Sequence, residues 1–183
     1  MINESKYKLI EIATGNTVSY SNVKLVFKGK FGLKDSNGNN LYEWKDNIIP
    51  ISEYILDKWE QVKEYRTALD KSPISYAGKL FDYDDDSRAK LDKAQDALKA
   101  AKEKSLPMTS IEWTCYDNSK YNLTLDDFDM FNIAIAVRSN KLHIQARYIY
   151  NYLNSFSDTD ENKQIIKDLD LSELFKMDLT KYS

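Results

Sequence analysis

Apolar and polar residues alternate along much of the first fifty positions, which is the pattern of strands with one buried face. Residues 7–12 form one such run, and the turn-forming residues 13–16 close it. The pair Asn37-Gly38 predicts a hairpin turn, because both residues tolerate positive φ, and residues 41–44 would return as a strand. A further strand is expected before this turn, with a shared apolar face of Leu25, Phe27, Phe31 and Leu33.

Later segments repeat their apolar residues every three or four positions, which predicts α-helices with one buried face. The first covers residues 51–70, after Pro50 and ahead of Pro73, because a proline disfavours helical geometry at the residue before it. The second covers residues 86–104, and its narrow apolar seam packs either within the chain or against a second copy. The seam consists of Leu91, Ala94, Leu98 and Ala101.

The longest periodic segment runs from residue 125 to residue 156 and predicts a long helix. Residues 138–141 interrupt its pattern, so a kink or a break is expected there. A last short helix is predicted over residues 162–175, and residues 176–183 are expected to form a tail. The inward residues of the short helix are expected to be Ile165, Ile166, Leu169 and Leu174.

The stretch Ser110–Phe131 contains a tryptophan, the only cysteine and a run of acids. It is either an active site, with Cys115 as the nucleophile and the acids Asp126, Asp127 and Asp129 as acid catalysts or metal ligands, or a hairpin that leads into the long helix. The alternation around Trp113 and the turn-type residues after it favour the hairpin. Thr124 has the position of a helix N-cap with Asp127 three residues later, which is an acidic form of the capping box.

These elements predict an α+β protein in two parts. Residues 1–75 would form an N-terminal antiparallel β unit with one helix, which serves for attachment. Residues 76–183 would form a helix, a β-hairpin, a long helix and a short helix. The boundary is expected within residues 71–78, because proline and glycine cluster there.

Composition narrows the range of partners. The chain has 183 residues and a net charge of −3, without the basic surplus typical of a nucleic-acid-binding protein. One cysteine makes no intrachain disulfide, which favours a reducing compartment. We expect no secretory signal, no membrane contact and no specific nucleic-acid partner. The strand expected before the Asn37-Gly38 turn carries lysines on its polar face, which would bind an acidic partner or keep the sheet edge exposed to water. These lysines are Lys24, Lys28, Lys30 and Lys34.

Catalytic chemistry finds little support in the sequence. Cys115 as a nucleophile needs a base, and the only histidine is His143, far away in the long helix. The acids within Asp82–Asp86 match the first ligand positions of an EF-hand calcium loop. Such a loop then requires a glycine and, at its end, a glutamate, but this sequence has Ser87 and Lys93 at those two positions. We therefore predict no enzyme and no catalytic, cofactor-binding or metal-binding residues. Thiol chemistry at Cys115 and a metal site at Asp82–Asp86 remain the alternatives.

The segment Tyr76–Leu142 combines four sequence features in a fixed order. An "F-D-x-D-x-x-S" entry precedes an alanine- and lysine-rich helix, and "W-x-x-x-D-N/G" and "L-T-x-x-D-L/F" follow. The residues concerned are Phe81, Asp82, Asp84 and Ser87, then Trp113, Asp117 and Asn118, then Leu123, Thr124, Asp127 and Phe128. In this order of parts the segment resembles an uncharacterised domain family of bacteriophages and prophages, found in tail-fibre and other virion-associated proteins.

The resemblance implies context more than chemistry, because that family has no assigned activity. It implies a virion structural protein of the tail or fibre apparatus, made in the host cytoplasm and acting through protein–protein contacts. Its partners would be other virion proteins of the tail, fibre or neck, and several copies are expected to associate. The alternative is a tail-fibre assembly chaperone that does not remain in the virion.

Overall fold

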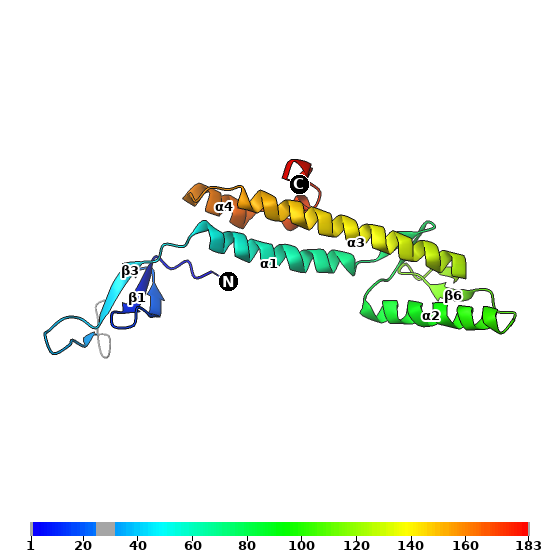
Figure 1. Cartoon of the computed structure of the whole chain (residues 1–183), viewed down its shortest axis with the longest axis horizontal. Coiled ribbons are helices and arrows are strands. Elements are labelled where there is room, and N and C mark those ends of the chain that lie inside the picture. Colours follow the sequence, from blue (N-terminus) through cyan, green and yellow to red (C-terminus); the bar gives the residue numbers. More distant parts are fainter. Residues whose placement is uncertain (1, 25–31, 183) are drawn as a thin grey trace. The chain divides into compact units, whose positions relative to one another are not determined.

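The computed structural model describes residues 2–24 and 32–182, which form an α+β chain as predicted. The chain divides into two compact units, each built from segments distant in sequence. Unit 1 is Met1–Lys58 with Phe156–Asp168, and unit 2 is Trp59–Ser155 with Leu169–Ser183. Figure 1 follows their helices and strands in chain order. The boundary predicted at residue 75 concerns which fragment folds alone, and it stays a prediction.

The sheet of unit 1 has three antiparallel strands: β1 (Tyr7–Glu11), β2 (Thr17–Ser21) and β3 (Tyr42–Asp46). Their order is β2-β1-β3, so the strand predicted at residues 7–12 is confirmed as the central one. Its residue Leu9 is buried. The returning strand predicted after the hairpin turn is also confirmed, and it pairs with β1.

The hairpin turn predicted at Asn37-Gly38 is confirmed. Gly38 has a φ of +85°, and the Asp35 carboxylate accepts hydrogen bonds from the backbone N–H groups of Asn37 and Asn39, both at 2.8 Å. Most of the strand predicted before this turn, residues 25–31, lies outside the described residues. Leu33 was expected on the buried face of that strand, but 54% of it is exposed, so the expectation is wrong for this residue.

The helix predicted over residues 51–70 is confirmed as α1 (Ile51–Asp70). Its first two turns belong to unit 1, together with α4 (Asp160–Asp168). The ammonium group of Lys58 in α1 is largely buried and donates a hydrogen bond to the carbonyl oxygen of Lys167 in α4 at 2.9 Å. This contact joins two segments that are more than a hundred residues apart.

The last helix, predicted as one, is two: α4 and α5 (Leu171–Leu174). The side chain of Asp170 interrupts the helix, because it accepts a hydrogen bond from the backbone N–H of Glu173 at 2.9 Å and so caps α5. Ile166 is buried as predicted. Ile165 is 39% exposed, so its predicted inward position is wrong.

Unit 2 contains the predicted hairpin of β6 (Ile111–Thr114) and β7 (Lys120–Leu123). A second hairpin, β4 (Ile74–Tyr76) with β5 (Lys79–Phe81), was not predicted. Its two-residue loop is Ala77-Gly78, with φ values of 48° and 72°. Positive φ at both loop residues is the geometry of a type I′ turn, which alanine does not signal in a sequence.

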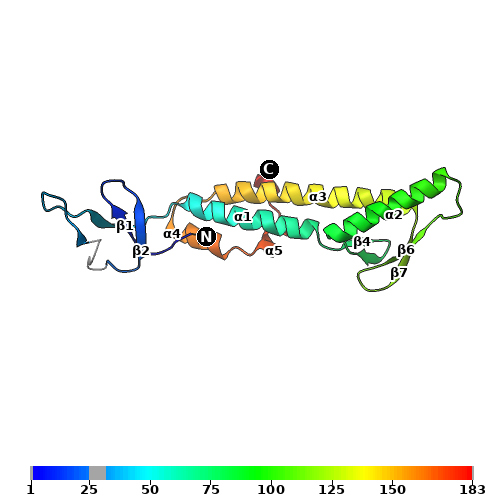
Figure 2. The ribbon, with the colours of Figure 1, turned by 90° about the horizontal axis from the view of Figure 1, so that it is seen from below.

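The core of unit 2 lies between these hairpins, α2 (Asp85–Glu103) and α3 (Leu125–Asn154). The predicted apolar seam of α2 is buried inside the chain, which settles its packing as intrachain. Figure 2 shows α2 beside the N-terminal half of α3. The buried residues of the core are Ile74, Phe81, Tyr83, Leu91, Ala94, Leu98, Cys115, Leu123, Phe128 and Phe131.

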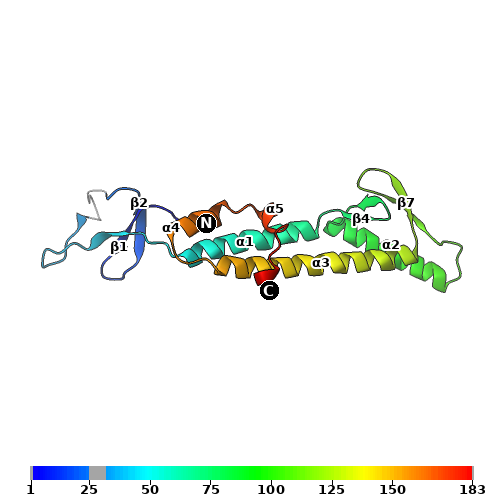
Figure 3. The same ribbon diagram turned by 90° about the horizontal axis from the view of Figure 1, so that it is seen from above.

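The long helix α3 is continuous for 30 residues, so the break expected at residues 138–141 is wrong. Its C-terminal half runs antiparallel to the part of α1 in unit 2 (Figure 3). The rings of Trp59 and Tyr150 are 5.0 Å apart, and 3.3 Å separates a guanidinium nitrogen of Arg66 from Nδ1 of His143. The residue numbers of the partners on α3 decrease as those on α1 increase, as antiparallel packing requires.

The C-terminal segment is not the free tail that was expected. It contains a short 3₁₀ helix, η2 (Thr180–Tyr182), and Leu179 is buried. The side-chain amide of Asn151 in α3 donates a hydrogen bond to the carbonyl oxygen of Tyr182 at 2.6 Å. Among the described residues, no helix is long and apolar enough to cross a membrane.

Candidate functional site

Cys115 lies inside the core of unit 2 and is 2% exposed. Its backbone N–H donates to the carbonyl oxygen of Ser119 at 2.8 Å and thereby closes the β6–β7 turn. His143 is exposed on α3, beside Arg66. No hydrogen bond joins Cys115 to His143 within the described ranges. The structure therefore places the thiol among core side chains, in agreement with the hairpin interpretation of this stretch.

The acids of Asp82–Asp86 lie at the start of α2. Asp84 is the N-cap, and its side chain accepts a hydrogen bond from the backbone N–H of Ser87 at 2.8 Å. This hydrogen bond lowers the pKa of Asp84. Asp85 and Asp86 occupy the first turn, where the helix dipole favours negative charge. Over residues 2–24 and 32–182, no group of three or more His, Cys, Asp or Glu side chains is placed to hold a metal ion.

Asp127 is the centre of a hydrogen-bond network at the start of α3. The predicted capping box is confirmed, with Thr124 as the N-cap. The carboxylate of Asp127, at the third helical position, accepts hydrogen bonds from the backbone N–H of Thr124 at 2.9 Å and from the Thr124 hydroxyl at 2.6 Å. The hydroxyls of Tyr76 and Tyr121 donate to the other carboxylate oxygen at 3.0 and 3.1 Å. This network joins both hairpins to α3.

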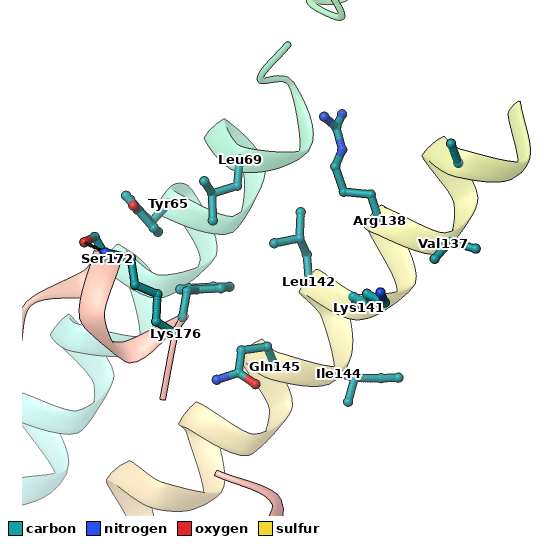
Figure 4. A pocket seen from close by; sticks show the side chains of 12 residues that line it. Tyr65, Leu69, Val137, Arg138, Lys141, Leu142, Ile144, Gln145, Ser172 and Lys176 are labelled. Atoms are coloured by element: carbon teal, nitrogen blue, oxygen red, sulfur yellow. Dashed lines mark hydrogen bonds between the residues drawn. The ribbon is translucent and has the colours of Figure 1, made fainter. Parts of the chain in front are cut away.

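An open, largely apolar groove of about 850 Å³ lies between α1, α3 and α5 in unit 2. Figure 4 shows Leu69 of α1 and Leu142 of α3 facing each other across it, whereas Val137 and Ile144 point away from α1. Val137 and Ile144 also line it and are exposed, whereas its other apolar lining residues are half-buried, so water reaches carbon surface that the fold leaves uncovered. These half-buried residues are Tyr65, Leu69, Ala134, Leu142 and Phe175.

Polar contacts hold the walls of the groove in place. The side-chain amide of Gln145 on α3 donates to the carbonyl oxygens of Leu174 and Met177, both at 3.0 Å, and ties α5 to α3. The rings of Tyr65 and Phe175 lie 5.5 Å apart and tie α5 to α1. The groove is therefore a formed feature whose three sides are fixed to one another.

At one end of the groove, Arg138 joins α3 to the C-terminus of α1. Its guanidinium group donates hydrogen bonds to the carbonyl oxygens of Asp70, Ser72 and Pro73, at 2.5, 2.8 and 3.4 Å. Burial lowers the pKa of Arg138. The sequence missed this role, because the arginine interrupts the apolar pattern of α3 and was interpreted as a weak point.

The rim of the groove carries positive charge. Lys141 of α3 and Lys176, which follows α5, are both exposed and line it. Lys176 also contacts the carboxylate of Glu173 at 2.9 Å. An apolar wall with cations on its rim fits an apolar segment flanked by acidic residues, because both types of contact are then satisfied.

Residues 55–168 match the model of a family described as a domain of unknown function, DUF4376. The chain belongs to this family, and the matched range contains the whole segment that carried the resemblance. The match confirms that this segment belongs to a domain family without an assigned activity. The description of the family names no activity and no phage. Comparison with curated proteins and with solved structures finds no match.

Proposed function

We propose that this member of the DUF4376 family is a structural protein of a bacteriophage particle, in the tail or fibre apparatus. In this proposal it acts through protein–protein contacts rather than catalysis, and it passes from the host cytoplasm into the virion. Its partner is a neighbouring virion protein that inserts an apolar, acid-flanked segment into the groove of unit 2.

The groove is the observation that carries this proposal. Exposed apolar surface with a polar rim is typical of sites where another protein binds. An amphipathic helix fits such a site, because its apolar face covers the carbon lining while its polar face stays in water. Acidic residues beside that face would meet Lys141 and Lys176 on the rim.

The phage context is supported by the order of sequence features over Tyr76–Leu142, which resembles phage and prophage proteins. The residues of that resemblance serve the fold. Asp84 and Thr124 cap helices, Asn118 occupies the positive-φ position of a turn, and Phe128 lies in the core. They build the part of unit 2 that supports the N-terminal half of α3, which suits a scaffold that presents a binding surface.

The proposal is tested by quantitative mass spectrometry of gradient-purified particles, compared with the cleared lysate of the host. We expect a fixed ratio of this chain to the capsid protein across particle fractions. Abundance in the lysate with absence from particles would overturn the structural role. That result would favour the assembly chaperone, which binds a fibre protein and is then released.

The role of the groove is tested separately by incorporation of a Leu142→Glu variant into particles. Leu142 lines the groove, so a carboxylate there opposes an apolar, acidic partner. Leu56→Glu is the matched control, because Leu56 lies in unit 1 and is 54% exposed. We expect at least a tenfold loss of incorporation for Leu142→Glu and none for the control, with the fold of both variants checked by circular dichroism. Equal incorporation of two folded variants would contradict the binding role of the groove.

A further inference from the structure

The helix α3 has two apolar faces. One face is buried in unit 2 and carries Phe128, Phe131, Ala146, Ile149 and Leu153. The opposite face bears four large apolar side chains that remain exposed. They are Met130 at 54%, Ile133 at 56%, Val137 at 47% and Ile144 at 43%. Surface helices of globular proteins normally present polar residues on this side, so the outer face of α3 is unusual.

The outer residues follow the seven-residue repeat of a helix–helix seam. Met130, Val137 and Ile144 are seven residues apart, and Ile133 and Asn140 each follow three residues after one of them. This is the alternation of three and four that lets two helices interlock side chains.

Charge along the same face changes sign from one end to the other. Asp126 and Asp129 lie ahead of the apolar residues, and Lys141 and Arg147 lie toward the other end. All four are exposed, and none of them makes an ion pair within the part of the chain that the structure describes. Asp126 and Arg147 are separated by about 32 Å along the helix axis, from the rise of ~1.5 Å per residue.

A surface that is acidic at one end, apolar in the middle and basic at the other is complementary to itself when reversed. We propose that the outer face of α3 pairs with the same face of a second copy of this chain, antiparallel, around a two-fold axis near Val137. Met130 then faces Ile144 of the second copy, and Asp126 and Asp129 approach its Arg147. A two-fold axis repeats every contact, so each favourable pair is formed twice.

A second copy explains the charge gradient better than an unrelated partner does, because only a reversed copy must match both ends at once. Antiparallel packing also places the acidic start of each α3 beside the basic part of the other. The inference goes beyond the proposed function, because it concerns the isolated chain whether or not that chain enters a particle.

The oligomeric state of the purified full chain, measured by sedimentation velocity from about 1 to 100 µM, tests the proposal. We expect a dimer in the micromolar range, since a seam of this length is at the small end of specific interfaces. Val137→Glu should raise the dissociation constant at least tenfold, because the two-fold axis would bring the two carboxylates together. Val18→Glu is the control, because Val18 is a similarly exposed apolar residue in β2, at 42%. A monomer at all concentrations, or a dimer unaffected by Val137→Glu, would overturn the proposal.

Charge exchange and cross-linking test the direction of the pair. Arg147→Glu should weaken the dimer, and adding Asp126→Arg and Asp129→Arg to the same chain should restore it. Val137→Cys should form an intermolecular disulfide, whereas Met130→Cys should not, because Met130 faces Ile144 and not its own copy. Efficient cross-linking at Met130→Cys would indicate a parallel pair and contradict the antiparallel arrangement. The native cysteine does not interfere, because Cys115 is buried.

Discussion

The hydroxyl of Tyr76 donates a hydrogen bond to the carboxylate of Asp127 at 3.0 Å, and this contact fastens the β4–β5 hairpin to the start of α3. The two residues are separated by fifty-one positions. Burial, together with the hydrogen bond to the negative Asp127, raises the pKa of Tyr76 to about 12. The neutral tyrosine and the ionised carboxylate therefore stabilise each other.

Unit 2 should lose stability at alkaline pH through Tyr76. Its pKa in the folded state is above the ordinary value of 10.0, so unfolding becomes more favourable as the pH rises from 10 to about 12. In the Tyr76→Phe variant this part of the loss should disappear, although its stability at pH 7 should be lower. Urea unfolding across this pH range measures both effects. Tyr116→Phe is the control, because Tyr116 is 57% exposed; equal alkaline losses in all three proteins would contradict the prediction.

Asp127 should contribute stability that is lost in acid. Burial alone would raise the pKa of Asp127, but the hydrogen bonds from Thr124, Tyr76 and Tyr121 outweigh burial and lower the pKa below 3.8. Its contribution is therefore present above pH 3.8 and is lost as the pH falls through the folded-state pKa. Asp127→Asn should be less stable than the native chain at pH 7, and the difference should shrink in acid. A difference independent of pH would contradict this.

The loop of the β4–β5 hairpin offers a stabilising substitution. Ala77 has a φ of 48°, in the left-handed region that costs an alanine about 1 kcal/mol. Asparagine tolerates this region, so Ala77→Asn should raise the free energy of unfolding by about 0.5–1 kcal/mol. Gly78→Ala should do the reverse, because Gly78 has a φ of +72° although an added Cβ would meet no atom within 4 Å. Denaturant midpoints of both variants measure the two changes.

The sequence predicted those helices, turns and caps whose residues lie close together along the chain. Thr124 and Asp127 lie three residues apart, so their capping box was recognisable before the structure. The β4–β5 hairpin was missed because Ala77 has no turn signature, and its position is fixed by contacts such as that of Tyr76 with Asp127. The role of short polar capping residues was also underestimated, since Asp170 is the N-cap of α5 and so starts a second helix within the segment predicted as one.

The groove could not be predicted, because its lining comes from three separate parts of the chain. Leu69, Leu142 and Phe175 each have an ordinary place in the periodicity of their own segment. Which of them remains uncovered depends on how closely α5 approaches α3, and this follows from the Gln145 hydrogen bonds. The buried face of α3 followed from the periodicity of its segment, which includes Phe128, Ile149 and Leu153. The exposed apolar residues of the outer face are not part of that periodic stripe, so the stripe gave no sign of them.

Arg138 should be the polar side chain whose loss most weakens the junction of α1 and α3. Its guanidinium group holds the carbonyl oxygens of Asp70, the last residue of α1, and of Ser72 and Pro73 just after it, which have no helical partners. Arg138→Met keeps much of the side-chain volume but leaves these acceptors without a donor. Hydrogen bonds to charged groups contribute about 1.5–3 kcal/mol, so we expect a destabilisation of that order.

A lysine at this position distinguishes the geometry of the contact from its charge. Arg138→Lys keeps the positive charge, but one ammonium group does not reach carbonyl oxygens spread over three residues as the planar guanidinium does. Its stability in urea unfolding should therefore lie between those of the native chain and Arg138→Met. Full recovery by lysine would mean that charge alone matters here, and the role of the guanidinium group as a clamp on the end of α1 would be wrong.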